Sequence, residues 1–168
     1  MTYSTHPLRH LTIGLAALCL AGLIAAGCDK GKSPSTPYDD GPAQTKSDID
    51  SVLEPQLTDL SVLEQAFANQ RSDFQVLVKG TVTRFLSDDV SGSEHQRFIV
   101  QMANGQTLLV AHNIDLGQRL PTTALNHIVY LYGEYAWTSE GGVIHWTHID
   151  PAKTHVDGWI QFDGVKYQ

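Results

Sequence analysis

The sequence predicts a mainly β protein, and three features of residues 74–168 lead to that prediction. Apolar and polar residues alternate with a period of two from Phe74 onward, and β-forming residues dominate. Asn104-Gly105 lies between two such runs, which is a strong signal for a hairpin. Gly80 interrupts the longest run, where a bend or bulge is expected. These features predict an OB-fold-like antiparallel five-stranded barrel with one N-terminal helix; an antiparallel sandwich is the alternative.

The N-terminal helix is predicted within residues 49–69, where apolar residues recur at helical spacing. Ser61 with Glu64 fits a capping box, and Pro55 makes the stretch before it a separate turn or a broken helix. The apolar stripe consists of Leu60, Leu63, Ala66 and Phe67. We expect this stripe to pack against the barrel rather than to bind a partner.

The strands follow in a regular order along the rest of the chain. The connection from Asp115 to Asn126 contains Pro121 and a short helical turn, and the tail around Asp163-Gly164 forms a last small hairpin. The five predicted strands are FQVLVKGTVTRFL (74–86), RFIVQM (97–102), TLLVAH (107–112), HIVYLYGEYAW (127–137) and VIHWTHI (143–149).

Residues 1–27 have the layout of a secretory signal peptide. A short, weakly basic start precedes a run of small and aliphatic residues that is too short for a spanning helix. The run ends in Ala25-Ala26-Gly27-Cys28, which resembles the bacterial lipobox. The resemblance implies diacylglycerol on the Cys28 sulfur and cleavage before Cys28. An ordinary signal peptide that contains a cysteine is the alternative.

Residues 28–46 are predicted to be a flexible tether between the anchor and a domain that covers residues 47–168. The tether is rich in Pro, Gly, Ser, Thr and charged residues, and such a segment buries too little apolar area to fold. The expected location is the cell envelope, lipid-anchored and facing the periplasm. Asp29 resembles the signal that retains lipoproteins in the inner membrane, so that membrane is favoured.

Composition excludes several function classes. The chain has a formal net charge of −7, and removal of residues 1–27 takes away Arg9 and no acid, so nucleic acid is not an expected partner. The two cysteines are Cys19, within the signal, and Cys28. No thiol therefore remains for a disulfide, a nucleophile or a metal. Phosphate-binding loops and common catalytic signatures are absent from the sequence.

Several strings in residues 63–168 resemble a family of small bacterial proteins of unknown function. The strings are HQRFIV (95–100), LLVAHNID (108–115), GEY (133–135), GGVIHWTHIDP (141–151) and GWI (158–160). The resemblance implies membership of this family, and it implies no established activity.

Histidine is the residue type that offers chemistry. In a strand, His148 and Asp150 share one face, Pro151 ends the strand, and the chain can fold back to bring His155 near that face. This trio predicts a site for a divalent transition metal, either zinc, copper or nickel, or else a general acid–base group. His95 and His112 join only if the barrel brings them to the same end. In the simpler alternative, these histidines bond backbone groups or face solvent.

Two functions remain open from the sequence. The first is a membrane-anchored, periplasm-facing lipoprotein whose OB-like domain binds a small ligand, a metal ion or an envelope protein. The second is a small metal-dependent hydrolase that uses His148, Asp150 and His155. A structural adaptor of the envelope, without metal or ligand pocket, is a third class.

Overall fold

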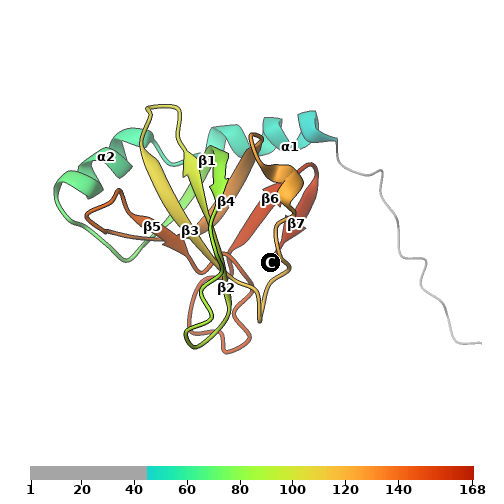
Figure 1. Cartoon of the computed structure of the whole chain (residues 1–168). Helices are drawn as coiled ribbons and strands as arrows, with labels where there is room; N and C mark the ends of the chain where they lie inside the picture. Colours follow the sequence, from blue (N-terminus) through green and yellow to red (C-terminus); the bar gives the residue numbers. More distant parts are fainter. Residues whose placement is uncertain (1–44) are drawn as a thin grey trace, which may run out of the picture. The chain divides into compact units, whose positions relative to one another are not determined.

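A computed structural model describes residues 45–168, which form one compact unit of two helices and seven strands (Figure 1). The predicted signal peptide, Cys28 and the tether up to residue 44 lie outside the described residues. The helices are α1 (Lys46–Leu53) and α2 (Leu60–Ala68), with 3-10 turns η1 (Glu54–Gln56) and η2 (Thr122–Ala124). The strands are β1 (Phe74–Phe85), β2 (His95–Gln101), β3 (Thr107–Asn113), β4 (Ile128–Ala136), β5 (Val143–His145), β6 (Trp159–Phe162) and β7 (Val165–Tyr167).

Strands β1 to β5 close into a barrel with the pairing of an OB-fold. The order is β1-β2-β3-β5-β4, and β1 pairs with β4 to complete the circle. All pairs are antiparallel except β3 with β5, which run parallel. This closure confirms the predicted OB-like barrel and excludes the sandwich. The predicted tail hairpin is also present, as β6 and β7, and it extends the sheet beyond β4.

The long strand β1 pairs with two neighbours, and it bends near Gly80, where the sequence predicted a bend or bulge. Its first part pairs with β4 as far as Thr81, and its second part pairs with β2 from Thr81 onward. The register shifts between Val82 and Arg84, which marks a bulge. Gly80 lies just before it, where an added Cβ would stand 3.1 Å from the Gln101 carbonyl oxygen and 3.1 Å from Met102 Sδ. The missing side chain allows β1 to curve over its neighbour.

The core consists of alternate residues of the strands together with one face of α2. Leu63 and Ala66 of α2 are buried against the barrel, which confirms that the stripe packs on the domain, although Phe67 is 38% exposed. The helix starts two residues earlier than the predicted capping box requires, because Asp59 is the N-cap and accepts a hydrogen bond from the Ser61 N–H. A second helix, α1, precedes it, with a capping box between Thr45 and Asp48.

Strand β5 is shorter than predicted. It ends at His145, because Trp146 has a positive φ of 53° that breaks the extended backbone. Residues 147–149, predicted as strand, therefore follow an irregular path. Within residues 45–168, neither helix has the length and run of apolar residues needed to span a bilayer.

The Tyr130 hydroxyl is one of the contacts that hold helix α1 on the barrel, together with the buried side chain of Ile49. The Tyr130 hydroxyl of β4 lies 2.7 Å from Asp50 Oδ1 and 2.9 Å from Glu54 Oε1. Lys46 pairs with Asp50, and Lys79 of β1 pairs with Glu54. The hydrogen bonds from Lys46 and Lys79 lower the pKa of Asp50 and of Glu54 respectively, and the Tyr130 hydroxyl adds to both shifts. Burial raises the pKa of Tyr130, so the phenol stays a donor.

Replacing Tyr130 with Phe should loosen α1 without disturbing the barrel. The two carboxylates are partly exposed, so the expected loss of stability is modest, about 1 kcal/mol in urea denaturation. Because both carboxyl pKa values are lowered on folding, their contribution is present above the ordinary carboxyl range and lost as pH falls below about 4. Hydrogen exchange at pH 7 and pH 3.5 checks this: α1 amides should lose protection in the variant and at low pH. Unchanged protection in both cases would contradict the assigned contact.

Candidate functional site

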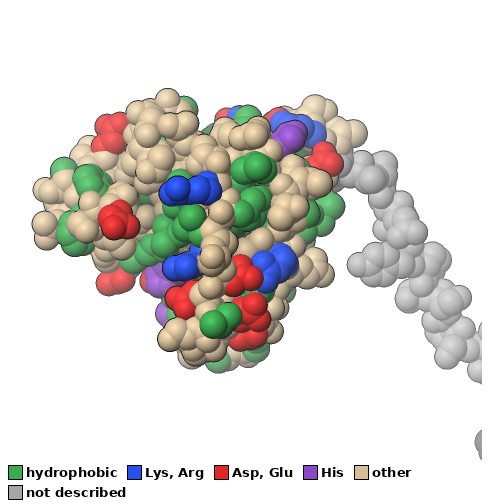
Figure 2. All heavy atoms as spheres, in the orientation of Figure 1, with side chains coloured by type: hydrophobic (Ala, Val, Ile, Leu, Met, Phe, Trp, Pro, Cys, Tyr) green, Lys and Arg blue, Asp and Glu red, His purple; other side chains and the backbone are tan. Residues whose placement is uncertain are grey.

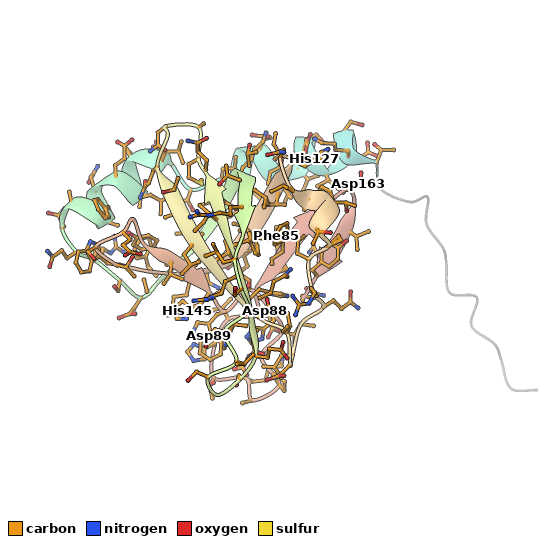
Figure 3. The ribbon with its side chains drawn as sticks, viewed as in Figure 1. Phe85, Asp88, Asp89, His127, His145 and Asp163 are labelled. Carbon is orange, nitrogen blue, oxygen red and sulfur yellow. The ribbon has the colours of Figure 1, made fainter. Side chains whose placement is uncertain are left out.

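Strand pairing brings three histidine-bearing strand ends together. His95 starts β2 and pairs with Asn113, the last residue of β3. Because β5 runs parallel to β3, its last residue, His145, lies at the same end of the barrel. Figure 3 shows His145 on the side of Asp88 and Asp89 of the β1–β2 loop. His127 lies at the opposite end, and its Nδ1 bonds the Leu125 carbonyl.

A cavity of about 270 Å³ opens at this end, and we call it the histidine cleft. Ala111 lies in the middle of the three strands on the outer face, between Arg97 of β2 and the end of β5. Its small side chain leaves a depression between larger neighbours. The lining residues are Ser93, His95, Ala111, Asn113, His145, Trp146 and His148.

The imidazoles of the cleft are only partly satisfied. Nδ1 of His95 lies 2.8 Å from the Ser93 carbonyl oxygen, and Nδ1 of His148 lies 2.8 Å from that of Ile149. A carbonyl only accepts, so each Nδ1 carries the hydrogen and the neutral ring keeps a lone pair on Nε2. His145 Nε2 is buried without a hydrogen bond, 3.3 Å from Glu134 Oε1. Burial lowers the pKa of His145, and the nearby Glu134 opposes that shift.

Trp146 forms an indole wall of the cleft and has a strained backbone. Its positive φ is held by Gly158, where an added Cβ would stand within 2 Å of the Trp146 carbonyl oxygen. The His155 ring stacks on the indole at 3.6 Å between ring centres and an angle of 18°. A left-handed aromatic residue costs conformational energy and is typical of functional positions.

A buried polar layer lies behind the cleft and holds the connection between β3 and β4. His112 is fully buried; its Nε2 donates to the Gln118 carbonyl, and its Nδ1 accepts from the Thr147 hydroxyl, each at 2.9 Å. Gln96 binds both the N–H and the carbonyl of Leu120. Burial lowers the pKa of His112 to about 4, and the charges of His148 and His95 act in the same direction.

The predicted trio does not come together as a metal site. Asp150 is used by its own loop: it accepts the N–H groups of Ala152, Thr154 and His155 and the Thr154 hydroxyl. These hydrogen bonds, that of His155 foremost, hold the pKa of Asp150 far below its usual range. His148 is turned to the cleft, while His155 is exposed on Trp146. Among residues 45–168, no three His, Cys, Asp or Glu side chains are placed to share a metal ion.

Sequence reasoning missed His145 and Trp146 as cleft residues. Both residues belong to the fifth predicted strand, and neither was singled out there. Only Ile144 is in the core, and Trp146 is half-buried on the outside. The available signal was the parallel β3–β5 pairing of an OB barrel, which places the end of the fifth strand beside the end of the third.

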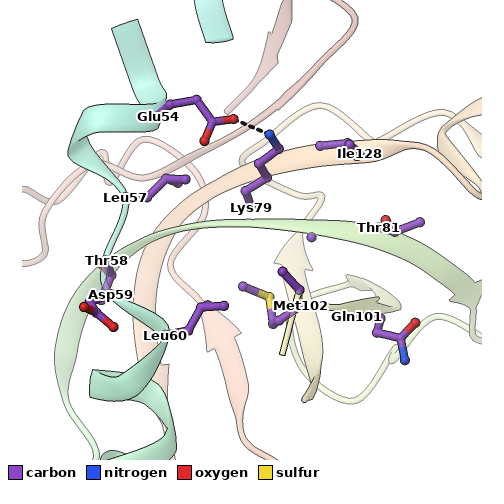
Figure 4. Close-up of a pocket in the computed structure, with 12 residues that line it drawn as sticks. Glu54, Leu57, Thr58, Asp59, Leu60, Lys79, Thr81, Gln101, Met102 and Ile128 are labelled. Atoms are coloured by element: carbon purple, nitrogen blue, oxygen red, sulfur yellow. Dashed lines mark hydrogen bonds and ion pairs between the residues drawn. The ribbon is translucent and has the colours of Figure 1, made fainter. Parts of the chain in front are cut away.

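A larger cavity of about 700 Å³ lies between the turn that links the helices and β1 (Figure 4). Its walls include the apolar side chains of Leu57, Leu60 and Met102. Its charged pair, Glu54 and Lys79, is already joined. Two of its polar residues are used by the fold, since Asp59 caps α2 and the Thr58 hydroxyl accepts from the Leu77 N–H. We take the histidine cleft as the candidate site because three imidazoles and an indole converge there.

The buried layer predicts a pH dependence of stability. The pKa of His112 falls from 6.5 to about 4 on folding, because burial disfavours the charged ring. The free energy of unfolding should therefore be highest above pH 6.5 and should decrease by about 3 kcal/mol as the pH drops to 4. His112→Gln should be less stable at pH 7 but should lose most of this slope in denaturation measured at several pH values. His127→Gln is the control and should keep the slope. A His112→Gln protein with the slope of the unmodified protein would contradict the assignment.

Comparison with known proteins agrees with the expected resemblance. Residues 49–168 match the model of a family described as "Protein of unknown function (DUF3465)". The match covers α2, every strand of the barrel and the whole histidine cleft. A search of curated proteins finds no matching sequence. The chain therefore belongs to this DUF3465 family of proteins of unknown function.

Proposed function

We propose that this protein is a lipid-anchored binding protein of the cell envelope that faces the periplasm and takes up a small ligand, or part of an envelope protein, in the histidine cleft. One observation carries the binding half of the proposal. The cleft combines three imidazoles and an indole in one cavity on the outer face of β2, β3 and β5. OB-folds use this face for ligands, and convergent polar groups in a concave site are the usual mark of a binding site.

The anchoring half of the proposal is supported by the sequence. The lipobox-like Ala25-Ala26-Gly27-Cys28 gives an acylation site, and residues 29–44 separate it from the first described residue. Asp29 favours retention in the inner membrane. The family match begins at residue 49, after the anchor and tether segments. The metal-dependent hydrolase is not proposed, because Asp150 and His155 have other partners.

Cys28→Ser should release the protein from the membrane. The unmodified protein should label with palmitate in a bacterial host and partition into the detergent phase, because the acyl chains supply the membrane affinity. The variant should do neither. Protease added to spheroplasts should degrade the anchored domain, since it faces outward. Labelling that survives the substitution, or a domain that is protected in intact spheroplasts, would contradict the anchor or the orientation.

Ala111→Leu should fill the cleft and abolish binding there. The fragment 45–168 is screened by NMR against a library of small amines, carboxylates and aromatic rings. Hits should shift the amides of residues 93–95, 111–113 and 145–148, and the Leu variant should lose them. Ala103→Leu is the matched control, because Ala103 lines the larger cavity. A library without hits in the cleft, or hits that survive Ala111→Leu, would count against the proposal.

A further inference from the structure

We propose that the histidine cleft binds a small planar heteroaromatic molecule that carries an N–H donor and no negative charge. This inference rests on the proposed function and names the chemical class of its ligand. Four properties of the cleft lead to it: its volume, the hydrogen-bonding state of its imidazoles, its indole wall and the charge of the neighbouring loops.

The volume sets the size of the ligand. A cavity of about 270 Å³ corresponds to roughly nine water molecules at about 30 Å³ each. It is smaller than the cavities of about 300–1,000 Å³ that hold drug-sized molecules. The cleft therefore has room for one ring or two fused rings, and it is too small for an oligomer.

The imidazoles set the hydrogen-bonding character of the ligand. Nδ1 of His95 and Nδ1 of His148 are both occupied by backbone carbonyl groups, so their Nε2 atoms act as acceptors in the neutral rings. His145 Nε2 is buried and faces Glu134, whose Oε1 lies 3.3 Å away, so the two acceptors left for a ligand are those of His95 and His148. A ligand that presents an N–H group satisfies these acceptors, whereas a ligand with acceptors alone leaves them unpaired.

The indole wall sets the shape of the ligand. Trp146 lines the cleft while His155 stacks on its ring and Gly158 fits against its backbone, so the indole is held in place before a ligand arrives. A rigid aromatic wall favours a planar ring, which stacks or packs edge to face.

The surrounding charge excludes anions. Asp89, in the loop between β1 and β2, is joined to His95 by two backbone hydrogen bonds. Glu94 lies in the same loop, and its N–H donates to Asp115 in the connection between β3 and β4. Figure 2 shows acidic side chains gathered on this lower part of the domain. Two cations lie nearby: Arg119 pairs with Asp88 and Glu94, and Arg97, beside Ala111, donates from Nε to the Ser87 carbonyl. The four carboxylates Asp88, Asp89, Glu94 and Asp115 outnumber these two guanidinium groups. A phosphate or carboxylate on the ligand would meet repulsion here, so a neutral or cationic ring fits best.

The test compares benzimidazole with 1-methylbenzimidazole, which has the same ring without the N–H donor. Both are titrated into the fragment from residue 45 and followed by NMR shifts of the cleft amides. Benzimidazole should bind in the cleft, and the methylated ring should bind about three- to tenfold more weakly, which is the value of one net hydrogen bond. Equal affinity of the two rings, or shifts outside the cleft, would overturn the proposal.

Paired variants locate the acceptor. His95→Phe keeps a planar ring but removes Nε2. It should therefore weaken the binding of benzimidazole about three- to tenfold and leave the affinity for 1-methylbenzimidazole unchanged. His127→Phe at the far end is the matched control and should affect neither ring. If His95→Phe weakens both rings equally, the side chain acts by shape and the assigned acceptor is wrong.

Two further probes separate this inference from the proposed function. Acetate and zinc chloride are titrated in the same way, and an Ala111→Leu sample is included for each. Cleft binding of acetate or zinc without benzimidazole binding would overturn the ligand class and leave a binding cleft in place. Absence of cleft binding by every probe and by the fragment library would overturn both.

Discussion

The pairing of one strand with two neighbours is the constraint on which this structure depends. A strand that joins β2 and β4 must curve, and β1 curves at the bulge between Val82 and Arg84, next to Gly80. Without that curvature the sheet stays open, and the parallel contact between β3 and β5 is lost. The ends of β2, β3 and β5 then no longer meet. The candidate site is therefore a consequence of how the barrel closes.

The fold was largely predictable from the sequence because its signals are local. Alternation identified the strands, Asn104-Gly105 the first hairpin, Gly80 the curved strand and Asp163-Gly164 the last hairpin. Two errors have specific causes. The cap of α2 moved to Asp59 because that carboxylate reaches the Ser61 N–H. Strand β5 stopped at His145 because the backbone of Trp146 turns left-handed, which no pattern of apolar residues encodes.

The candidate site was only partly predictable, because it is assembled from strand ends and an irregular segment. The trio of His148, Asp150 and His155 assumed a strand that continues to residue 149, with alternating faces. The break at Trp146 removes that assumption and sends His148 to the cleft. His95 and His145 come together because β2 pairs with β3 and β3 pairs with β5. These long-range pairings follow from the barrel topology and not from any local sequence pattern.

Unsatisfied atoms distinguish ligand-facing residues from structural ones at this end of the barrel. Both nitrogens of His112 have partners, and the carboxylate of Asp150 accepts from three N–H groups and a hydroxyl, so neither has capacity left for a ligand. His95 and His148 each use one nitrogen for a backbone carbonyl, whereas His145 Nε2 lies 3.3 Å from Glu134 Oε1. The Nε2 atoms of His95 and His148 are therefore free to accept a hydrogen bond from a ligand. The hydrogen-bond partners thus divide these side chains into two groups. His112 and Asp150 support the fold, whereas His95 and His148 form part of the binding surface.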